Sequence, residues 1–198
     1  RPARHSRRSC RRSSSPAART RLRQMVGHMV VDARDKQFGS TVAKLTGEGH
    51  RLNINLLGEA VLGDGEADHH LDETHRLLAR DDVDYVSVKV SSVASQLSMW
   101  AFDETVDYVV DRLRPLYAQA AKAPTGAKFV NLDMEEYRDL ELTIAVFTRL
   151  LSEPEFKDLE AGIVIQAYQP DALGAIQRLS EFASARVAAG GAGIKVRL

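Results

Sequence analysis

Short apolar runs alternate with longer stretches of helical periodicity between residue 51 and the end of the chain. The runs predict five strands, near residues 51–57, 84–91, 127–132, 162–167 and 194–198. Between them, apolar residues recur every three or four positions, which predicts helices near 67–80, 102–122 and 138–152 and a further helix after Pro170. Strands that are apolar throughout are typical of a parallel sheet covered on both faces. The pattern therefore predicts an α/β fold of repeated strand–helix units.

Four of the predicted strands end in polar or charged residues. Glu59 follows the first strand, Lys89 lies near the end of the second, Asp133 follows the third, and Gln166 ends the fourth. Parallel barrels build their active sites at the carboxyl ends of their strands. A doubly wound sheet shares the alternation, but residues 57–60 lack its glycine-rich phosphate turn. Because 198 residues are fewer than the about 250 of a complete barrel, the sequence predicts a partial (β/α)8 barrel, about the first five units.

The first 24 residues differ from the rest of the chain. Arginine, serine, proline and alanine dominate them, so they cannot bury enough apolar surface to fold. We predict a disordered arm over residues 1–24 and a truncated barrel over residues 25–198. The arginine-rich and acid-free composition is also typical of an organelle transit peptide, and a wrongly assigned start would give the same pattern. Residues 25–32 predict a short helix or early strand, and residues 41–48 predict a helix.

Charge is distributed unevenly, although the composition is ordinary for a soluble globular protein, with 44% hydrophobic and 27% charged residues. The whole chain has a net charge of zero, and the first 24 residues hold nine arginines and no acidic residue, so the remainder carries a net charge of −9. We therefore expect no nucleic-acid binding by residues 25–198. Cys10 is the single cysteine, which excludes an internal disulfide and a cysteine-built metal site and fits a reduced, intracellular setting.

Lys89 and Asp133 are the strongest candidates for chemistry. A lysine inside an apolar strand needs an anionic partner, which could be a substrate carboxylate or phosphate, or an internal acid. Asp133 could orient a cation or act as a base, or it could cap the helix that follows. Glu135 and Glu136 fit the first turn of that helix, where acidic residues are favourable.

Gln166 ends a very apolar strand, and its buried amide needs hydrogen-bond partners. A flat heteroaromatic ligand or a satisfied core amide would both supply them. Tyr168 could flank the same ligand or pack in the core. Arg197 lies within the last strand and needs an anion nearby. The histidines at positions 69, 70 and 75 do not share a helix face well, so no metal site is expected.

Five motifs then occur in order along the chain: residues 53–60 (Asn-Ile-Asn-Leu-Leu-Gly-Glu-Ala), 86–91 (Val-Ser-Val-Lys-Val-Ser), 131–137 (Asn-Leu-Asp-Met-Glu-Glu-Tyr), 164–169 (Val-Ile-Gln-Ala-Tyr-Gln) and 196–198 (Val-Arg-Leu). With these motifs, residues 25–198 resemble the proline dehydrogenase family of flavoenzymes. The resemblance is to the proline dehydrogenase part of bifunctional bacterial proteins that also carry an aldehyde dehydrogenase domain.

The resemblance implies a role for each motif residue. Lys89 would bind the proline carboxylate, with Glu59 as a secondary acid near it. Asp133 and Arg197 would be catalytic, Asp133 near substrate and flavin and Arg197 near the flavin N5. Residues that would contact the FAD cofactor are Met134, Gln166 and Tyr168.

The same resemblance implies oxidation of L-proline to 1-pyrroline-5-carboxylate, with electrons passed to a quinone or another membrane acceptor. A cytoplasmic protein, peripheral to the inner membrane, would suit that acceptor. Family segments beyond the Val-Arg-Leu strand have no counterpart here, so we expect the isolated chain to bind FAD poorly and to be inactive. Two alternatives stay open: a barrel lyase or aldolase that uses Lys89 as a Schiff base, and nucleic-acid binding through the basic arm.

Overall fold

The computed structural model describes residues 16–26, 30–31, 35–56 and 61–198. The chain divides into two compact units, residues 1–49 and residues 50–198. In the first unit the described helices are α1 (Pro16–Val26) and α2 (Asp35–Gly47). The predicted boundary between residues 24 and 25 stays a prediction. The Glu59 position lies outside the described residues.

Residues 16–26 of the first unit form helix α1, and the disordered arm over residues 1–24 stays a prediction. Pro16 occupies the first helical position, where the missing N–H costs nothing, and alanine, arginine and leucine are good helix formers. Within this helix the side chain of Leu22 is exposed. Composition alone does not detect this, because a helix can be satisfied by its own backbone hydrogen bonds.

The second unit is built on five parallel strands, β1 (Ile54–Asn55), β2 (Tyr85–Lys89), β3 (Phe129–Asp133), β4 (Ala161–Val164) and β5 (Ile194–Arg197). Each strand pairs with the one before it, in the order β1-β2-β3-β4-β5. A doubly wound sheet reverses its strand order at one point, whereas a barrel adds every strand on the same side. The order confirms the predicted barrel-type arrangement, as an unclosed sheet.

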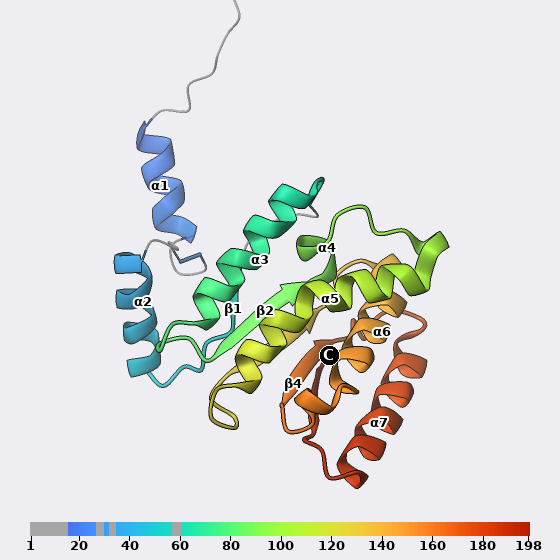
Figure 1. The fold of residues 1–198 in the computed structure, drawn as a ribbon. Helices are drawn as coiled ribbons and strands as arrows, with labels where there is room; N and C mark the ends of the chain where they lie inside the picture. The colour runs from blue at the N-terminus through green and yellow to red at the C-terminus, as the bar shows by residue number, and fades with distance from the viewer. Residues whose placement is uncertain (1–15, 27–29, 32–34, 57–60) are drawn as a thin grey trace, which may run out of the picture. The chain divides into compact units, whose positions relative to one another are not determined.

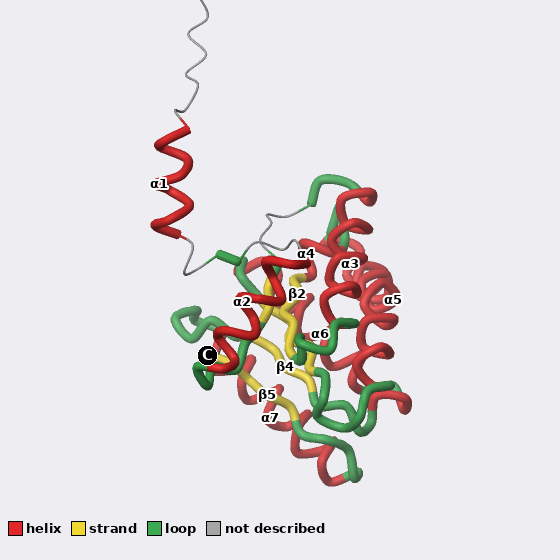
Figure 2. Tube along the Cα trace, turned by 90° about the vertical axis from the view of Figure 1, so that its left-hand side faces the viewer, coloured by secondary structure: helices red, strands yellow, loops and turns green. Residues whose placement is uncertain are grey.

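Four long helices connect the strands: α3 (Asp64–Leu78), α5 (Phe102–Ala121), α6 (Leu140–Leu151) and α7 (Ala172–Ala188). Consecutive helices contact one another, α3 with α5, α5 with α6 and α6 with α7, and they lie along the outside of the sheet (Figure 1). Figure 2 shows the strands as a continuous layer beside these helices. Helix positions were predicted to within a few residues.

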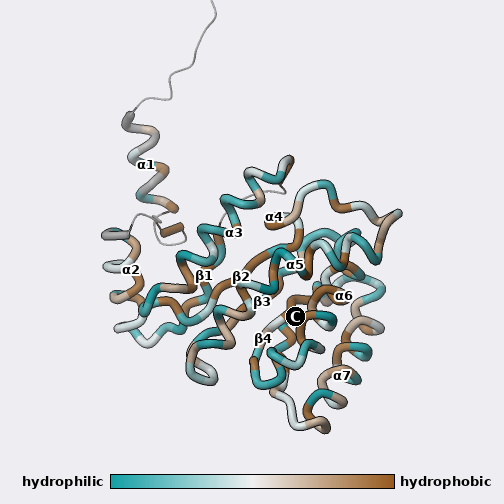
Figure 3. The backbone as a smooth tube through the Cα atoms, in the orientation of Figure 1, coloured by the Kyte–Doolittle hydropathy of each residue, from teal (hydrophilic) through white to brown (hydrophobic). Residues whose placement is uncertain are grey.

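The core lies between the sheet and the helices. Val86, Val88, Val130, Leu132 and Ile163 alternate along the strands and are at most 4% exposed. Hydrophobic colour runs along β2 and α6 in Figure 3. Because successive strand residues point to opposite faces, the residues between these positions line the other face of the sheet.

Short elements interrupt the regular units at the carboxyl ends of the strands. Helix α4 (Val90–Val93) starts directly after Lys89, where the predicted strand ran on to residue 91. The 3-10 helices η1 (Met99–Ala101) and η2 (Tyr137–Asp139) follow β2 and β3 at this end, whereas η3 (Pro154–Phe156) lies between α6 and β4, at the amino-terminal end of the sheet. Strand β1 covers two residues of the predicted 51–57. Across the described ranges, no helix is long and apolar enough to cross a membrane.

Candidate active site

Asp133 is the centre of a polar cluster at the carboxyl end of β3. Its side chain is buried, and donors from three other strands and from its own strand reach it. Arg197 donates from its guanidinium to Oδ1 at 2.7 Å, and Ser87 donates to the same oxygen at 3.2 Å. Asn131 donates to Oδ1 at 2.6 Å, and Asn55 donates to Oδ2 at 3.2 Å. The site is therefore assembled from β1, β2, β3 and β5.

Strand alternation explains why these side chains meet. Ser87 and Lys89 are two apart on β2, and Asn131 and Asp133 are two apart on β3, so each pair lies on one face of the sheet. The register of the two strands pairs Ser87 with Asn131 and Lys89 with Asp133. The hydrophobic residues between them point to the helices. The inner face is thus polar toward its carboxyl end.

The pKa of Asp133 reflects two opposing causes. Burial raises it, because a carboxylate loses hydration in the interior. The positive charge of Arg197 and the hydrogen bonds from Ser87 and Asn131 oppose that rise, and the nearby charge of Glu135 adds to it. The net effect is a raised pKa. Asp133 is a carboxyl group whose protonation depends on its immediate neighbours.

Lys89 lies at the end of β2, with 14% of its side chain exposed, and its Nζ forms an ion pair with Oε1 of Glu135 at 2.9 Å. Glu135 is itself largely exposed. The prediction that Glu135 and Glu136 lie in the first turn of a helix is wrong. Helix α6 begins at Leu140, and both acids precede it in the loop after β3 and at the start of η2.

Gln166 and Tyr168 contact each other after β4. The amide oxygen of Gln166 accepts hydrogen bonds from the Tyr168 hydroxyl and from Nε2 of Gln169, both at 2.7 Å. Gln169 is buried, whereas Tyr168 is 81% exposed. Met134 is buried in the core at 2% exposure, directly after Asp133. The flavin contacts expected of Met134, Gln166 and Tyr168 stay predictions.

Sequence reasoning missed the amide and hydroxyl donors around Asp133. Asn55, Ser87 and Asn131 are ordinary polar residues, and nothing in their local sequence marks them as partners of Asp133. The available signal was the spacing of two between Asn131 and Asp133 and between Ser87 and Lys89, which places each pair on one face of a strand. Glu135 and Gln169 were also missed as partners of predicted site residues.

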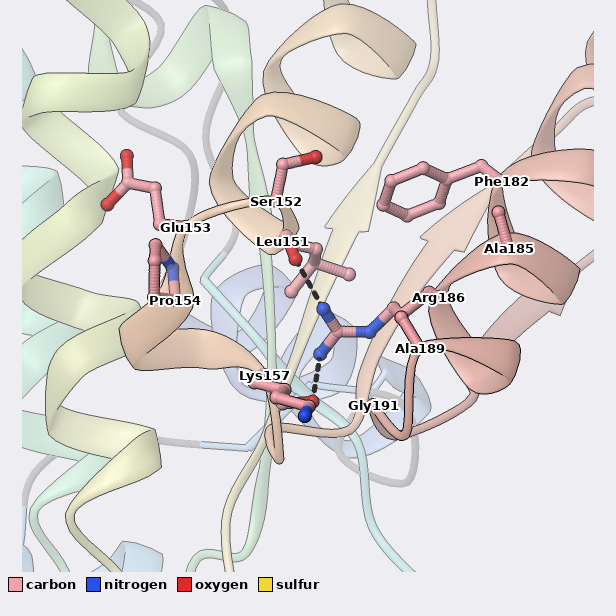
Figure 4. A pocket seen from close by; sticks show the side chains of 10 residues that line it. All are labelled: Leu151, Ser152, Glu153, Pro154, Lys157, Phe182, Ala185, Arg186, Ala189 and Gly191. Atoms are coloured by element: carbon pink, nitrogen blue, oxygen red, sulfur yellow. Dashed lines mark hydrogen bonds between the residues drawn. The ribbon is translucent and has the colours of Figure 1, made fainter.

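An apolar cavity of about 460 Å³ lies away from this cluster, between the ends of α6 and α7 (Figure 4). These ends lead into β4 and β5, so the cavity is at the amino-terminal end of the sheet. Arg186 borders it and donates to the carbonyl oxygens of Ala192 and Lys157, both at 2.8 Å, and to that of Leu151. Its donors are used by the backbone, which indicates a structural role.

The family model for proline dehydrogenase matches residues 38–198. Among curated relatives, the bifunctional protein PutA of Klebsiella aerogenes is 27% identical over 161 residues, which cover 71% of this chain and 12% of that protein. PutA of Escherichia coli gives the same values. The chain thus spans about an eighth of the length of these relatives.

Solved structures agree with this match. The structure of proline utilization A from Corynebacterium freiburgense is 53% identical, with a TM-score of 0.84, over 90% of this chain and 18% of that one. Proline utilization A from Bdellovibrio bacteriovorus, a crystal structure of protein inactivated by N-propargylglycine, is 31% identical, with a TM-score of 0.78, over 86% of this chain and 20% of that one. Because the family model covers more than half of the sequence, the chain belongs to the proline dehydrogenase family.

Proposed function

We propose that the protein that carries this chain oxidises L-proline to 1-pyrroline-5-carboxylate, with FAD as hydride acceptor and a membrane quinone as final acceptor. The observation that supports this most is the ion pair of Arg197 with the buried Asp133, beside Lys89, at the carboxyl ends of the strands. Barrel enzymes place their chemistry at that end. Membership of the proline dehydrogenase family supplies the substrate class.

The residues at this end suit an anionic substrate beside a flavin. Lys89 is a mostly buried cation, and a bound carboxylate would replace the exposed Glu135 as its partner. Arg197 keeps 42% of its side chain exposed while it holds Asp133, so its charge is also available to a ligand. FAD, when bound, supplies a two-electron acceptor. Arg197 would stabilise negative charge that develops next to it.

Gln166 fits the same ligand as a hydrogen-bond donor. Its amide oxygen is already occupied by Tyr168 and Gln169, and its NH2 group makes no hydrogen bond to any part of the chain that the structure describes. This NH2 group can donate a hydrogen bond to an acceptor atom of a flat ring. Asp133, fixed by its donors, would keep Arg197 oriented toward the reacting atoms.

The Schiff-base alternative is disfavoured by the ion pair of Lys89. A lysine that attacks a carbonyl needs its Nζ turned toward the substrate, whereas the Nζ of Lys89 is held 2.9 Å from Oε1 of Glu135. Borohydride trapping of a substrate on Lys89 would revive that alternative. The arm needed for the nucleic-acid alternative is described only from residue 16 onward.

The first experiment is an absorbance spectrum of the protein that carries this chain, before and after anaerobic addition of L-proline. We expect flavin bands at about 450 nm that bleach when proline is added, because proline reduces the flavin by two electrons. A colourless protein, or a flavin that proline leaves oxidised, would contradict the proposal.

We also propose that the isolated 198-residue chain binds FAD weakly and does not turn over proline. Its five strands leave the sheet open, so the inner face carrying Asp133 and Lys89 lacks the enclosure that excludes water from a reaction. Proline-dependent reduction of an electron-accepting dye by the isolated chain would show that this is wrong. The names of the curated relatives support a fused second enzyme domain in the longer protein.

A further inference from the structure

Asn131 is fully buried on β3, and it donates its shortest hydrogen bond, 2.6 Å, to Oδ1 of Asp133. Its own amide oxygen is buried and makes no hydrogen bond to any residue that the structure describes. A buried acceptor without a hydrogen bond destabilises the folded state. We infer that the hydrogen bond donated by the NH2 group of Asn131 offsets this loss. This hydrogen bond stabilises the buried carboxylate of Asp133.

We propose that Asn131 is a positioning residue that keeps the carboxylate of Asp133 ionised and in place, and that Gly162 is required because it leaves room for Asn131. The expected effect of Asn131 on turnover rests on the proposed function, in which Asp133 is catalytic. Its structural part, the support of a buried charge, does not depend on that role.

The charge on Asp133 decides how the Asn131 amide is turned. In the opposite orientation, the amide oxygen of Asn131 would face a carboxylate oxygen, and two negative partial charges at hydrogen-bond distance repel. The observed orientation therefore directs the NH2 group toward Asp133 and the oxygen away from it. The oxygen then points toward β4, at the position of Gly162.

Gly162 is the β4 residue paired with Asn131 in the strand register. A Cβ at this position would lie 2.4 Å from Oδ1 of Asn131 and 2.8 Å from Cε1 of Phe129. Carbon and oxygen atoms that are not bonded do not approach so closely, so any side chain here would displace Asn131. The need for glycine is steric, because the backbone of Gly162 lies in an ordinary strand.

Other groups also act on Asp133. Those that face it or lie within reach of its charge are Arg197, Lys89, Glu135, Ser87 and Asn55. Arg197 remains the main source of positive charge when Asn131 is changed, so Asp133 keeps a partner. We therefore expect loss of Asn131 to shift the protonation of Asp133 without abolishing the site.

The test compares Asn131→Leu with the unchanged protein over a range of pH. Burial already raises the pKa of Asp133, so the folded state binds this proton more tightly than the unfolded state and loses stability as pH rises through that range. Removing Asn131 raises the pKa further. The melting temperature of the variant should therefore fall below that of the unchanged protein by more at about pH 7 than at about pH 4.

Thr143→Val is the matched control for this comparison. Thr143 is also fully buried, and its hydroxyl makes no hydrogen bond to the described residues, but it lies on α6, away from the Asp133 cluster. Its effect on melting temperature should be the same at both pH values. If the loss of melting temperature in Asn131→Leu is also the same at both pH values, the proposal is wrong.

Kinetics separate the positioning role from the proposed reaction. If Asp133 must be ionised for turnover, the acid limb of the kcat/KM profile for proline should move up by about one pH unit or more in Asn131→Leu, the shift expected when a hydrogen bond to a charged group is lost. A pH-dependent melting difference without proline activity would contradict the proposed function alone. An unmoved acid limb in an active enzyme would contradict the positioning role.

Gly162→Ala tests the steric part, with Gly174→Ala as its control. A Cβ on Gly174, in α7, would meet no atom within 4 Å, and alanine is the better helix former, so that substitution should keep or raise the melting temperature equally at both pH values and leave the pH profile unchanged. Gly162→Ala should reproduce the pH-dependent loss of Asn131→Leu. If Gly162→Ala behaves as Gly174→Ala does, Gly162 has no such function.

Discussion

At the scale of single residues, the site depends on how two cations are partnered. Arg197 holds Asp133 at 2.7 Å, and Lys89 holds Glu135 at 2.9 Å. The first acid is buried and the second is exposed, so the two pairs differ in how easily a ligand can compete. An exposed carboxylate keeps most of its hydration and leaves its partner at little cost. Of the two cations, Lys89 is therefore the one that we propose binds a substrate carboxylate.

Replacing Lys89 with methionine should weaken proline binding. Methionine keeps the length and the apolar stem but removes the charge, and one hydrogen bond to a charged group is worth about 1.5–3 kcal/mol. We expect the KM for proline to rise about tenfold or more, while the flavin spectrum of the protein stays the same. Steady-state kinetics and an absorbance spectrum would check both.

Glu135→Gln is the control for Lys89→Met. Loss of this acid removes one competitor for Lys89, so the KM for proline should stay equal or fall. If both substitutions leave KM unchanged, Lys89 does not bind the substrate carboxylate.

Gln169 should determine the orientation of Gln166. It donates to the Gln166 amide oxygen, which leaves the NH2 group of Gln166 to act on a ligand. Gln169→Glu replaces this donor with an acceptor, so the Gln166 amide should turn and lose its donor role. We expect FAD affinity to fall about tenfold, which corresponds to about 1.4 kcal/mol. Titration of the apoprotein with FAD, followed by flavin fluorescence, would measure it.

Gln119→Glu provides the comparison for Gln169→Glu. Gln119 is also partly buried, but on α5 it pairs with His75, away from β4 and the residues that follow it. FAD affinity should not change in this variant. Equal loss of affinity in both variants would point to a general loss of structure.

At the scale of elements, one arginine forms hydrogen bonds with the segments that precede two of the strands. Arg186, in the last turn of α7, donates to the carbonyl oxygens of Ala192 and Leu159, at 2.8 and 3.1 Å. These residues precede β5 and β4, respectively. Gly190, with a φ of 75°, closes α7 in the left-handed conformation that suits glycine. The end of α7 thereby fixes where β5 begins, and so where Arg197 meets Asp133.

Arg186→Lys should destabilise the fold. A lysine keeps the charge, but a single ammonium group cannot reproduce the planar fork that reaches several carbonyl groups at once. Burial lowers the pKa of Arg186, because the charged guanidinium loses hydration in the interior. We expect a loss of roughly 2–3 kcal/mol in the free energy of unfolding, measured by urea denaturation.

Arg149→Lys is the matched control on α6. Arg149 pairs with Asp107 at 2.9 Å, and both side chains are about 60% exposed. Exposed ion pairs contribute little, so the change should be at most about 0.5 kcal/mol. If Arg186→Lys lowers the free energy of unfolding by no more than this, the hydrogen bonds from Arg186 to the backbone carbonyls do not stabilise the segments that precede β4 and β5.

At the scale of the whole molecule, charge is separated along the chain. Nine arginines lie in residues 1–24, and the remaining residues carry a net charge of −9. The candidate site belongs to the acidic part. We therefore expect the basic segment to be the main source of electrostatic attraction to an anionic polymer.

Removing residues 1–24 should abolish any binding of DNA. We expect residues 25–198 to show no binding at about 0.1 M salt, because a net negative chain repels phosphate groups. Any binding by the complete 198-residue chain should weaken steeply as salt rises. A fluorescence anisotropy titration with labelled DNA checks both, and salt-resistant binding by residues 25–198 would revive a nucleic-acid function.

The order of strands and helices in residues 50–198, and the residue types at the strand ends, could be predicted from the amino-acid sequence. Both are local properties: helices and strands have different hydrophobic periods, and the last residue of a strand can be identified from its neighbours. Lys89, Asp133, Gln166 and Arg197 could be proposed as site residues for this reason. The resemblance carried by their motifs also led to the family that the comparisons confirm.

Which of these residues contact one another depends on the folding of the whole sheet. Arg197 meets Asp133 across 64 residues of sequence, and Asn55 meets it across 78, because strand register brings them together. The need for glycine at position 162 follows from the distance between β3 and β4, which no local pattern records. Helix α1 depends on hydrogen bonds within its own backbone, and the ion pair of Lys89 with Glu135 depends on the conformation of the loop after β3. Amino-acid composition determines neither.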